Sequence, residues 1–230
     1  MDAVQLRVPS PFSPDQRRVV IVPSVSTTYR DRSSSLPQIG QTIAEVVALR
    51  PGPYIAFFPS FAYLAAVREH LPRLGEVLVQ APRSSLADRR ALLDRFVGGR
   101  GPRVLLAVSG GVFGEGIDLP GDALLGAFVV GPCLPPIGFQ RAAMARYFES
   151  TRQAGFAYAM IYPGLQRVVQ AAGRVIRRED DRGVVVLMGR RFVRPEIVEA
   201  LPDDWYQYDP SELVPEDPIA ALGEFWESSW

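Results

Sequence analysis

Hydrophobic and polar positions along the chain alternate between two periods. Short runs rich in Val, Ile, Leu and Phe predict buried strands at Arg18–Val25, Tyr54–Ser60, Glu76–Pro82, Arg103–Ser109, Leu124–Gly131 and Gly183–Gly189. Segments with apolar residues three and four positions apart predict helices at Pro37–Leu49, Phe61–Leu71, Leu86–Val97, Phe139–Ser150 and Leu165–Arg177. Strands that alternate with helices in this way predict an α/β fold, with a doubly wound, mainly parallel sheet and helices on both of its faces.

Residues 1–202 carry this alternation without an internal repeat, and they are predicted to form one domain. Residues 203–230 form a predicted tail that mixes acidic and aromatic residues with prolines. With 230 residues, of which 47% are hydrophobic, the chain is long enough to bury one large core. Because there is no apolar run that could cross a bilayer and no signal-peptide pattern at the N-terminus, we expect a cytoplasmic protein without membrane contact.

The charged residues are unevenly distributed. All 25 basic residues are arginines and lie in residues 1–199 with 17 acidic residues, whereas residues 200–230 hold 8 acidic residues and no basic one. A basic body favours an anionic partner, although a generally solvated surface remains an alternative, and arginine suits bidentate contacts to phosphate. Cys133 and His70 are the only residues of their types, which excludes a disulfide framework or a cysteine-ligated metal site built from this chain alone.

One candidate segment is Gln166–Gly183, which reads QRVVQAAGRVIRREDDRG. Helical spacing would place Gln170, Arg174 and Arg177 along one side of a helix, with Gly173 between them. Spacing alone favours a surface helix with solvated arginines, so a functional interpretation of this stripe needs support from other parts of the chain.

Other candidates follow two of the predicted strands, where ligands gather in open α/β sheets. Ser60 and Phe61 follow the strand that begins at Tyr54, and the strand that begins at Arg103 opens onto SGGVFGEGIDLPGD. Glycines in the second segment allow a ligand to approach the backbone closely, and its carboxylates add fixed acceptors. Neither GxxxxGK[ST] nor GxGxxG occurs in the chain, which argues against a complete phosphate-binding loop and a dinucleotide-binding fold.

In this order, the segments resemble the second motor domain of superfamily 2 helicases, and more closely the XPD and DinG branch of DNA helicases. FFPSFAYL (57–64) is similar to motif IV, GVFGEGIDLPGD (111–122) to motif V, and QAAGRVIR (170–177) to motif VI with its QxxGRxxR pattern. The resemblance extends over nearly all of residues 10–205. It implies a RecA-like fold and one half of an ATP-dependent DNA helicase. The implied partners are ATP with Mg²⁺, single-stranded DNA and the first RecA-like lobe of the same helicase.

The resemblance implies roles around ATP. The catalytic candidates are Gln170, Arg174 and Arg177. The ATP-binding candidates are Glu115, Gly116, Asp118 and Gly173. Arg174 and Arg177 would contact the γ-phosphate and stabilise charge on the phosphoryl group being transferred. Asp118 would hydrogen-bond the nucleotide sugar or orient motif VI, the alternative being an N-cap or turn carboxylate. Because their target would be held by the other lobe, Arg174 and Arg177 are expected to be exposed in this chain.

The resemblance also implies a path for single-stranded DNA along the ends of the strands. The candidate DNA-binding residues are Ser60, Phe61, Arg83, Ser109, Gly110 and Gly111. Backbone amides and hydroxyls that contact phosphates give affinity without reading sequence, as a translocating motor requires. Phe61 or Tyr63 could stack on a base, but an aromatic residue at helical spacing more often belongs to the core. Arg83 is equally compatible with a surface or ion-pairing arginine.

Several features of the family are missing from the sequence. It has no phosphate-binding loop, no DEAH-like acidic motif and no cysteine cluster, all of which the family carries in its first lobe; any iron–sulfur cluster would lie there. We therefore expect that the chain alone does not hydrolyse ATP, and that it is a C-terminal fragment or a separately encoded lobe acting in the bacterial cytosol or nucleoid. The alternative is a stand-alone helicase-like lobe that binds nucleic acid or protein without a motor cycle.

Two further segments depart from the family pattern or lie beyond it. MGRRF (188–192) carries two arginines where the family often has an acidic pair. The added positive charge either strengthens a nucleic-acid path or lies on the surface without a function. The tail is expected to dock on the domain, because exposed aromatic patches usually mark interfaces. Its alternatives are a partner-binding peptide or an acidic competitor for the DNA path.

Overall fold

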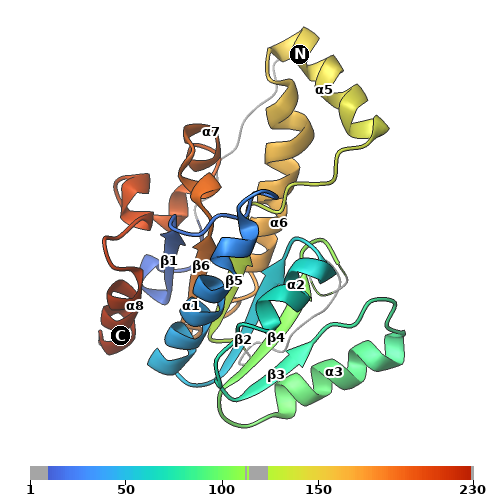
Figure 1. Cartoon of the computed structure of the whole chain (residues 1–230). Helices are drawn as coiled ribbons and strands as arrows, with labels where there is room; N and C mark the ends of the chain where they lie inside the picture. Colours follow the sequence, from blue (N-terminus) through green and yellow to red (C-terminus); the bar gives the residue numbers. More distant parts are fainter. Residues whose placement is uncertain (1–9, 112, 114–123, 229–230) are drawn as a thin grey trace.

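A single sheet organises the computed structural model, which describes residues 10–111, 113 and 124–228 (Figure 1). Within these residues, six strands lie in the order β1-β6-β5-β2-β4-β3, and every neighbouring pair is parallel. The strands are β1 (Arg17–Val22), β2 (Pro53–Phe58), β3 (Glu76–Val79), β4 (Arg103–Val108), β5 (Gly126–Val130) and β6 (Gly183–Met188). The strand predictions are therefore confirmed, with ends that differ by up to three residues.

Helices connect these strands. The α-helices are α1 (Leu36–Leu49), α2 (Phe61–Arg68), α3 (Leu86–Gly98), α5 (Phe139–Arg152), α6 (Tyr162–Ala172), α7 (Pro195–Val198) and α8 (Pro218–Glu227). Local capping explains where several of them begin. The Ser60 hydroxyl accepts the Tyr63 N–H at the start of α2, and Ser85 and Asp88 form a reciprocal capping box at the start of α3.

Alternate strand residues pack into two separate cores, one on each face of the sheet. In β1, Val19 and Ile21 belong to the core beneath α3, α6 and α7, whereas Val20 and Val22 belong to the core beneath α1, α2 and α8. All six residues of β6 are buried, because both faces of this strand are covered. The predicted doubly wound α/β architecture is confirmed.

The helix predicted at Leu165–Arg177 is wrong at both ends. It begins earlier, at Tyr162, directly after a π-helical turn at Ala157–Ile161, and it ends at Ala172. Gly173 caps it, with its N–H donated to the carbonyl of Val169 at 2.8 Å. Arg174 and Arg177 therefore do not lie on a helical stripe with Gln170. The apolar period continues past Gly173 because Val175 and Ile176 are buried beside the sheet rather than on the helix.

The tail packs on the domain through both cores. Short 3-10 turns at Asp203–Trp205 and Pro210–Leu213 place Trp205 and Leu213 in the first core, and α8 places Leu222 in the second. Helix α8 lies against α1 and the edge strand β1. The expected docking of the tail agrees with these contacts, while the domain boundary at residue 202 stays a prediction.

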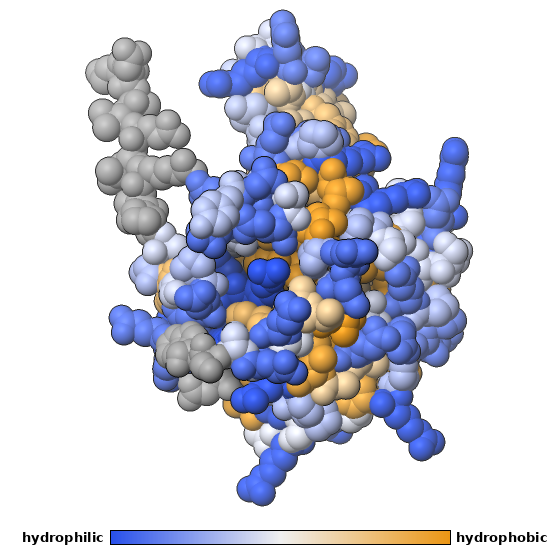
Figure 2. All heavy atoms as spheres, turned by 90° about the vertical axis from the view of Figure 1, so that its left-hand side faces the viewer, coloured by the Kyte–Doolittle hydropathy of each residue, from blue (hydrophilic) through white to orange (hydrophobic). Residues whose placement is uncertain are grey.

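A helical hairpin projects from the rest of the molecule, formed by α5, the π-helical turn and α6 (Figure 1). None of the α5 residues is buried. Figure 2, seen from the side on which β1 and α8 lie, shows the projection at the top and a band of apolar side chains between polar ones on the body. The chain thus leaves β5, passes through the hairpin and returns along α6 before β6.

Candidate functional site

The candidate residues fall into groups at opposite edges of the sheet. We call residues 173–182 the arginine loop; it follows α6 and leads directly into the amino end of β6 at Gly183. Ser60 and Ser109–Gly111 instead follow the carboxyl ends of β2 and β4. Because the strands are parallel, the start of β6 and the ends of β2 and β4 lie at opposite edges of the sheet. The arginine loop therefore ends at the edge opposite to these strand-end residues.

Two buried polar side chains hold the backbone of the arginine loop. One carboxylate oxygen of Asp181 accepts the N–H groups of Arg177 at 2.7 Å and Arg178 at 2.8 Å. The side-chain amide of Gln16 lies 3.0 Å from each of three carbonyl oxygens, those of Arg178, Glu179 and Asp181. Gln16 and Asp181 are 3% and 9% exposed, so these hydrogen bonds are shielded from water.

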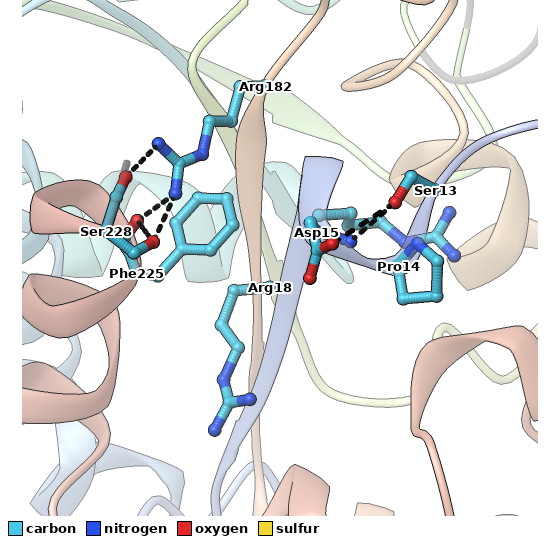
Figure 3. Close-up of a pocket in the computed structure, with 8 residues that line it drawn as sticks. Ser13, Pro14, Asp15, Arg18, Arg182, Phe225 and Ser228 are labelled. Carbon is cyan, nitrogen blue, oxygen red and sulfur yellow. Dashed lines mark hydrogen bonds between the residues drawn. The ribbon is translucent and has the colours of Figure 1, made fainter. Parts of the chain in front are cut away.

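Arg182 ties the end of the arginine loop to the tail (Figure 3). Its guanidinium donates to the carbonyl of Phe225, to the carbonyl of Ser228 at 2.9 Å and to the Ser228 hydroxyl at 2.6 Å. It also lies 4.4 Å from the centre of the Phe225 ring, within range of a cation–π interaction. A cavity of about 570 Å³ separates this contact from Arg18 and the N-terminal turn.

Arg174 and Arg177 are both half-buried, so the expectation that they are exposed is wrong. The side chains of Val175 and Ile176 are 1% and 4% exposed, and they hold the segment against the sheet. Arg174 and Arg177, which flank these two residues, are partly covered as a result. Gly173 is exposed, and a Cβ atom there would meet only the carbonyl oxygens of Val169 and Gln170 within 4 Å. No close packing within the described part of the chain therefore requires a glycine at this position.

At the carboxyl edge, Ser60 and Phe61 begin α2. The Ser60 hydroxyl accepts the Tyr63 N–H at 3.2 Å and therefore has a structural partner. Phe61 is half-buried, whereas Tyr63, the alternative stacking residue, is buried. Burial raises the pKa of the Tyr63 hydroxyl, and nearby Arg32 and Arg191 oppose that shift. Phe61 is thus the aromatic candidate that keeps accessible surface.

The turn after β4 forms a small niche with α6. Gly110 has a φ of +70°, and a Cβ atom there would lie 3.0 Å from the guanidinium carbon of Arg167. Gln170 lines the same niche as Ser109 and Gly110, rather than grouping with Arg177. The Cys133 thiol donates to the Ser109 hydroxyl at 3.1 Å, and burial raises the pKa of this thiol to about 11.

Additional arginines lie along the carboxyl edge, and they were not among the candidates from sequence. Arg191 donates to the Thr27 hydroxyl at 3.0 Å, and desolvation lowers its pKa. Arg190 forms an ion pair with Asp31; the Thr28 hydroxyl and then Arg190 lower the pKa of that carboxyl. With Arg167, these side chains make this edge basic. The pair of arginines in MGRRF was the signal in the sequence for Arg190 and Arg191.

The remaining candidates have less structural definition. Arg83 is exposed in the turn between β3 and α3, with a φ of 58°. Glu115, Gly116 and Asp118 lie outside the described residues. Within the described ranges, no group of His, Cys, Asp and Glu side chains is arranged to hold a metal ion. The helices of those ranges also include none with the length and apolar character needed to span a membrane.

The family model for the helicase C-terminal domain matches residues 43–208. This chain belongs to the helicase C-terminal domain family. Among curated relatives, it is 29% identical to the ATP-dependent DNA helicase DinG of Photobacterium profundum over 88% of this chain and 30% of that protein. It is 29% identical to the helicase subunit XPD of the general transcription and DNA repair factor IIH of Schizosaccharomyces pombe, over 80% of this chain and 26% of that protein.

A third relative, the ATP-dependent DNA helicase chl1 of Aspergillus niger, is 30% identical over 75% of this chain and 24% of its own length. The chain thus spans 24–30% of the length of these relatives. Among solved structures, an XPD helicase superposes with a TM-score of 0.65 at 19% identity, covering 80% of this chain and 33% of that one. The structure of S. tokodaii Xpd4 superposes with a TM-score of 0.58 at 15% identity, covering 83% of this chain and 38% of that one. These superpositions support the RecA-like fold, and the resemblance to the XPD and DinG branch is confirmed.

Proposed function

We propose that this chain is the second motor lobe of an ATP-dependent DNA helicase of the XPD and DinG type, acting on DNA in the cytoplasm. The observation that carries the proposal is the arginine loop. Its backbone is held by the buried side chains of Gln16 and Asp181, in a chain that matches the helicase C-terminal domain. A rigid, arginine-bearing loop suits a site where charge develops on a ligand supplied from outside the domain.

In this proposal, Arg174 and Arg177 contact the γ-phosphate of ATP that a first RecA-like lobe holds with Mg²⁺. Their guanidinium groups stabilise the negative charge that spreads over the phosphoryl oxygens during transfer. The first lobe supplies the phosphate-binding loop and the acidic residues for Mg²⁺, as well as any iron–sulfur cluster. Without that lobe, the chain is expected to have no ATPase activity. Gln170 would link the two edges of the lobe, because it lies near the end of α6, which leads into the arginine loop, and lines the niche beside Ser109.

Single-stranded DNA would follow the carboxyl edge of the sheet. Ser109 and Gly111 donate their N–H groups to the carbonyls of Phe58 and Val108, so these amides already have partners. We therefore propose phosphate contacts from the Ser109 hydroxyl, the Gly110 N–H and the guanidinium of Arg167, which lies over the turn. Contacts of this kind bind any sequence, and their affinity falls steeply with salt.

The ATPase part of the proposal is tested by combining the chain with a first lobe, fused or in trans, and measuring DNA-stimulated ATP hydrolysis. Arg174→Ala and Arg177→Ala are each expected to lower kcat by about 10³-fold or more, the range of other arginine fingers. Arg90→Ala, on the exposed side of α3, is the matched control and should leave kcat unchanged. Full activity of both loop variants would remove the arginines from the catalytic role.

The DNA part is tested with the chain alone and a fluorescently labelled oligonucleotide. Binding to single-stranded DNA should weaken linearly on a logarithmic salt scale. If the chain binds DNA but never supports ATP hydrolysis with a first lobe, the stand-alone binding module becomes the better description. If it binds no DNA at any salt concentration, the proposed path along the carboxyl edge is wrong.

A further inference from the structure

We propose that Gln16 and Asp181 are positioning residues that fix Arg177 for its contact with the γ-phosphate. This inference rests on the proposed function of the arginine loop. Neither side chain touches the nucleotide in our proposal; both act through the backbone on either side of Arg177. The observations are their burial, their convergence on one short stretch of backbone and the chemistry of their hydrogen bonds.

Asp181 acts on the backbone of Arg177 itself. One oxygen of its carboxylate accepts two consecutive N–H groups, from Arg177 at 2.7 Å and Arg178 at 2.8 Å. Hydrogen bonds to a charged acceptor are shorter and stronger than neutral ones, and this oxygen is largely shielded from water. On the other side of Arg177, Ile176 is packed in the core. The Cα position of Arg177 is therefore fixed from both directions.

Gln16 acts on the following residues from the opposite end of the sequence. Its amide nitrogen lies 3.0 Å from the carbonyl oxygens of Arg178, Glu179 and Asp181, which are 162 to 165 residues away. Its amide oxygen accepts the Ser13 N–H at 2.9 Å, so the orientation of the amide is determined by an N-terminal capping box. The Gln16 NH₂ group is thus a donor that faces three carbonyl acceptors of the loop.

Together, the two side chains satisfy polar backbone groups on both sides of the loop. A surface turn needs no such support, because water can satisfy its backbone groups. Here the support is buried and comes from segments far apart in sequence, and it is concentrated on the residues around one proposed catalytic arginine. Arginine has a long side chain, so a displacement at its Cα is carried to the guanidinium. Displacements near 1 Å at a reacting group can reduce rates by about 10²-fold.

Two substitutions remove the support in different ways. Gln16→Glu keeps the shape of the side chain but replaces the N–H donor with an oxygen that faces three carbonyl oxygens. Asp181→Ala removes the acceptor for both N–H groups. Matched controls are Gln140→Glu, an exposed glutamine on α5, and Asp180→Ala, the exposed carboxylate next to Asp181.

Amide hydrogen exchange in the chain alone measures the structural part. In both test variants, the amides of Arg177 and Arg178 should exchange about tenfold faster or more than in the parent, and in both controls they should not change. If Asp181→Ala does not fold, Gln16→Glu carries the measurement. Unchanged exchange in a folded test variant would overturn the inference while leaving the proposed function of the arginines intact.

Steady-state kinetics with a first lobe measure the functional part. Gln16→Glu should lower kcat between 10- and 100-fold while KM for ATP stays within about twofold, because the arginine acts mainly in the transition state. In an Arg177→Ala background, the same substitution should have no further effect. An equal loss of kcat in both backgrounds would show that Gln16 does not act through Arg177. If Arg177→Ala alone has no effect, the proposed role of Arg177 and this inference both fail.

Discussion

Replacing Gly164 with alanine should destabilise the protein, although alanine is the better helix former. Gly164 lies in α6 and faces the segment that leaves β5. A Cβ atom at this position would lie 2.5 Å from the carbonyl oxygen of Pro132, 2.9 Å from a methyl carbon of Leu134 and 3.2 Å from the Leu134 Cα. Two of these neighbours are backbone atoms, so a change of rotamer cannot relieve the contact. Helix α6 or the segment at Pro132 must move.

The magnitude follows from two opposing effects. Overpacking of this kind typically costs about 1–3 kcal/mol, whereas replacing a helical glycine with alanine contributes about 1 kcal/mol in the other direction. The shortest contact is with a backbone oxygen, which favours the upper part of the first range, so a net loss of about 1–2 kcal/mol is expected. For a chain of this size, that loss lowers the melting temperature by roughly 2–8 °C.

The assay is urea and thermal unfolding followed by circular dichroism. Gly98→Ala is the matched control: it is the last residue of α3, and a Cβ atom there would meet nothing within 4 Å. The control should be neutral or slightly stabilising. If Gly164→Ala were as stable as the parent, the inferred close packing of α6 against the β5 exit would be wrong.

Three further outcomes are expected. Burial raises the pKa of the Cys133 thiol from 9.0 to about 11, so at pH 8 this thiol should react about 100-fold more slowly with iodoacetamide in the folded protein than in the urea-unfolded chain. The free energy of unfolding should fall between pH 9 and 11, because the thiol of the unfolded chain ionises first, and Cys133→Ala should remove that part of the fall. Equal reactivity in the folded and unfolded states would contradict the assignment. Removing residues 203–230 deletes the buried side chains of Leu213 and Leu222, and it should make the chain insoluble or lower its melting temperature by roughly 10 °C or more. A stable truncated chain that binds DNA more tightly would instead favour a tail that competes for the DNA path. Arg167→Ala should weaken binding of single-stranded DNA and reduce its salt slope by about 1 with little change in melting temperature, and an unchanged affinity would exclude the proposed phosphate contact.

The sheet could be predicted from sequence because its strands are covered on both faces. A strand such as β6 reads as a continuous apolar run, which leaves little ambiguity about its position. The end of α6 was harder to predict from sequence than the strands. Val175 and Ile176 continue the apolar period of the helix, but they are buried in a non-helical segment that packs on the sheet. Periodicity reports burial, and it cannot distinguish these two ways of burying a residue.

The support of the arginine loop could not be predicted at all. Gln16 and Arg178 are 162 residues apart, and nothing in either local sequence indicates their contact. The same holds for Arg182, whose partners Phe225 and Ser228 lie in α8 and directly after it. The motifs point to the residues that are proposed to carry chemistry, because those residues are clustered in sequence. The residues that position them are dispersed, and only the folded chain brings them together.

The pairing of β1 with β6 has a consequence for how the lobe is made. Arg17 pairs with Gly183, so β1 can acquire its partner only after the other strands of the described sheet have been synthesised. Contacts over such long stretches of chain close slowly and leave the early segments exposed to aggregation in the meantime. A nascent or prematurely terminated chain would lack the β1–β6 pair and the Gln16 contacts beside it. Until β6 is made, β1 has no neighbouring strand among those that the structure describes, so a chaperone or a neighbouring domain that covers β1 would limit aggregation of this lobe.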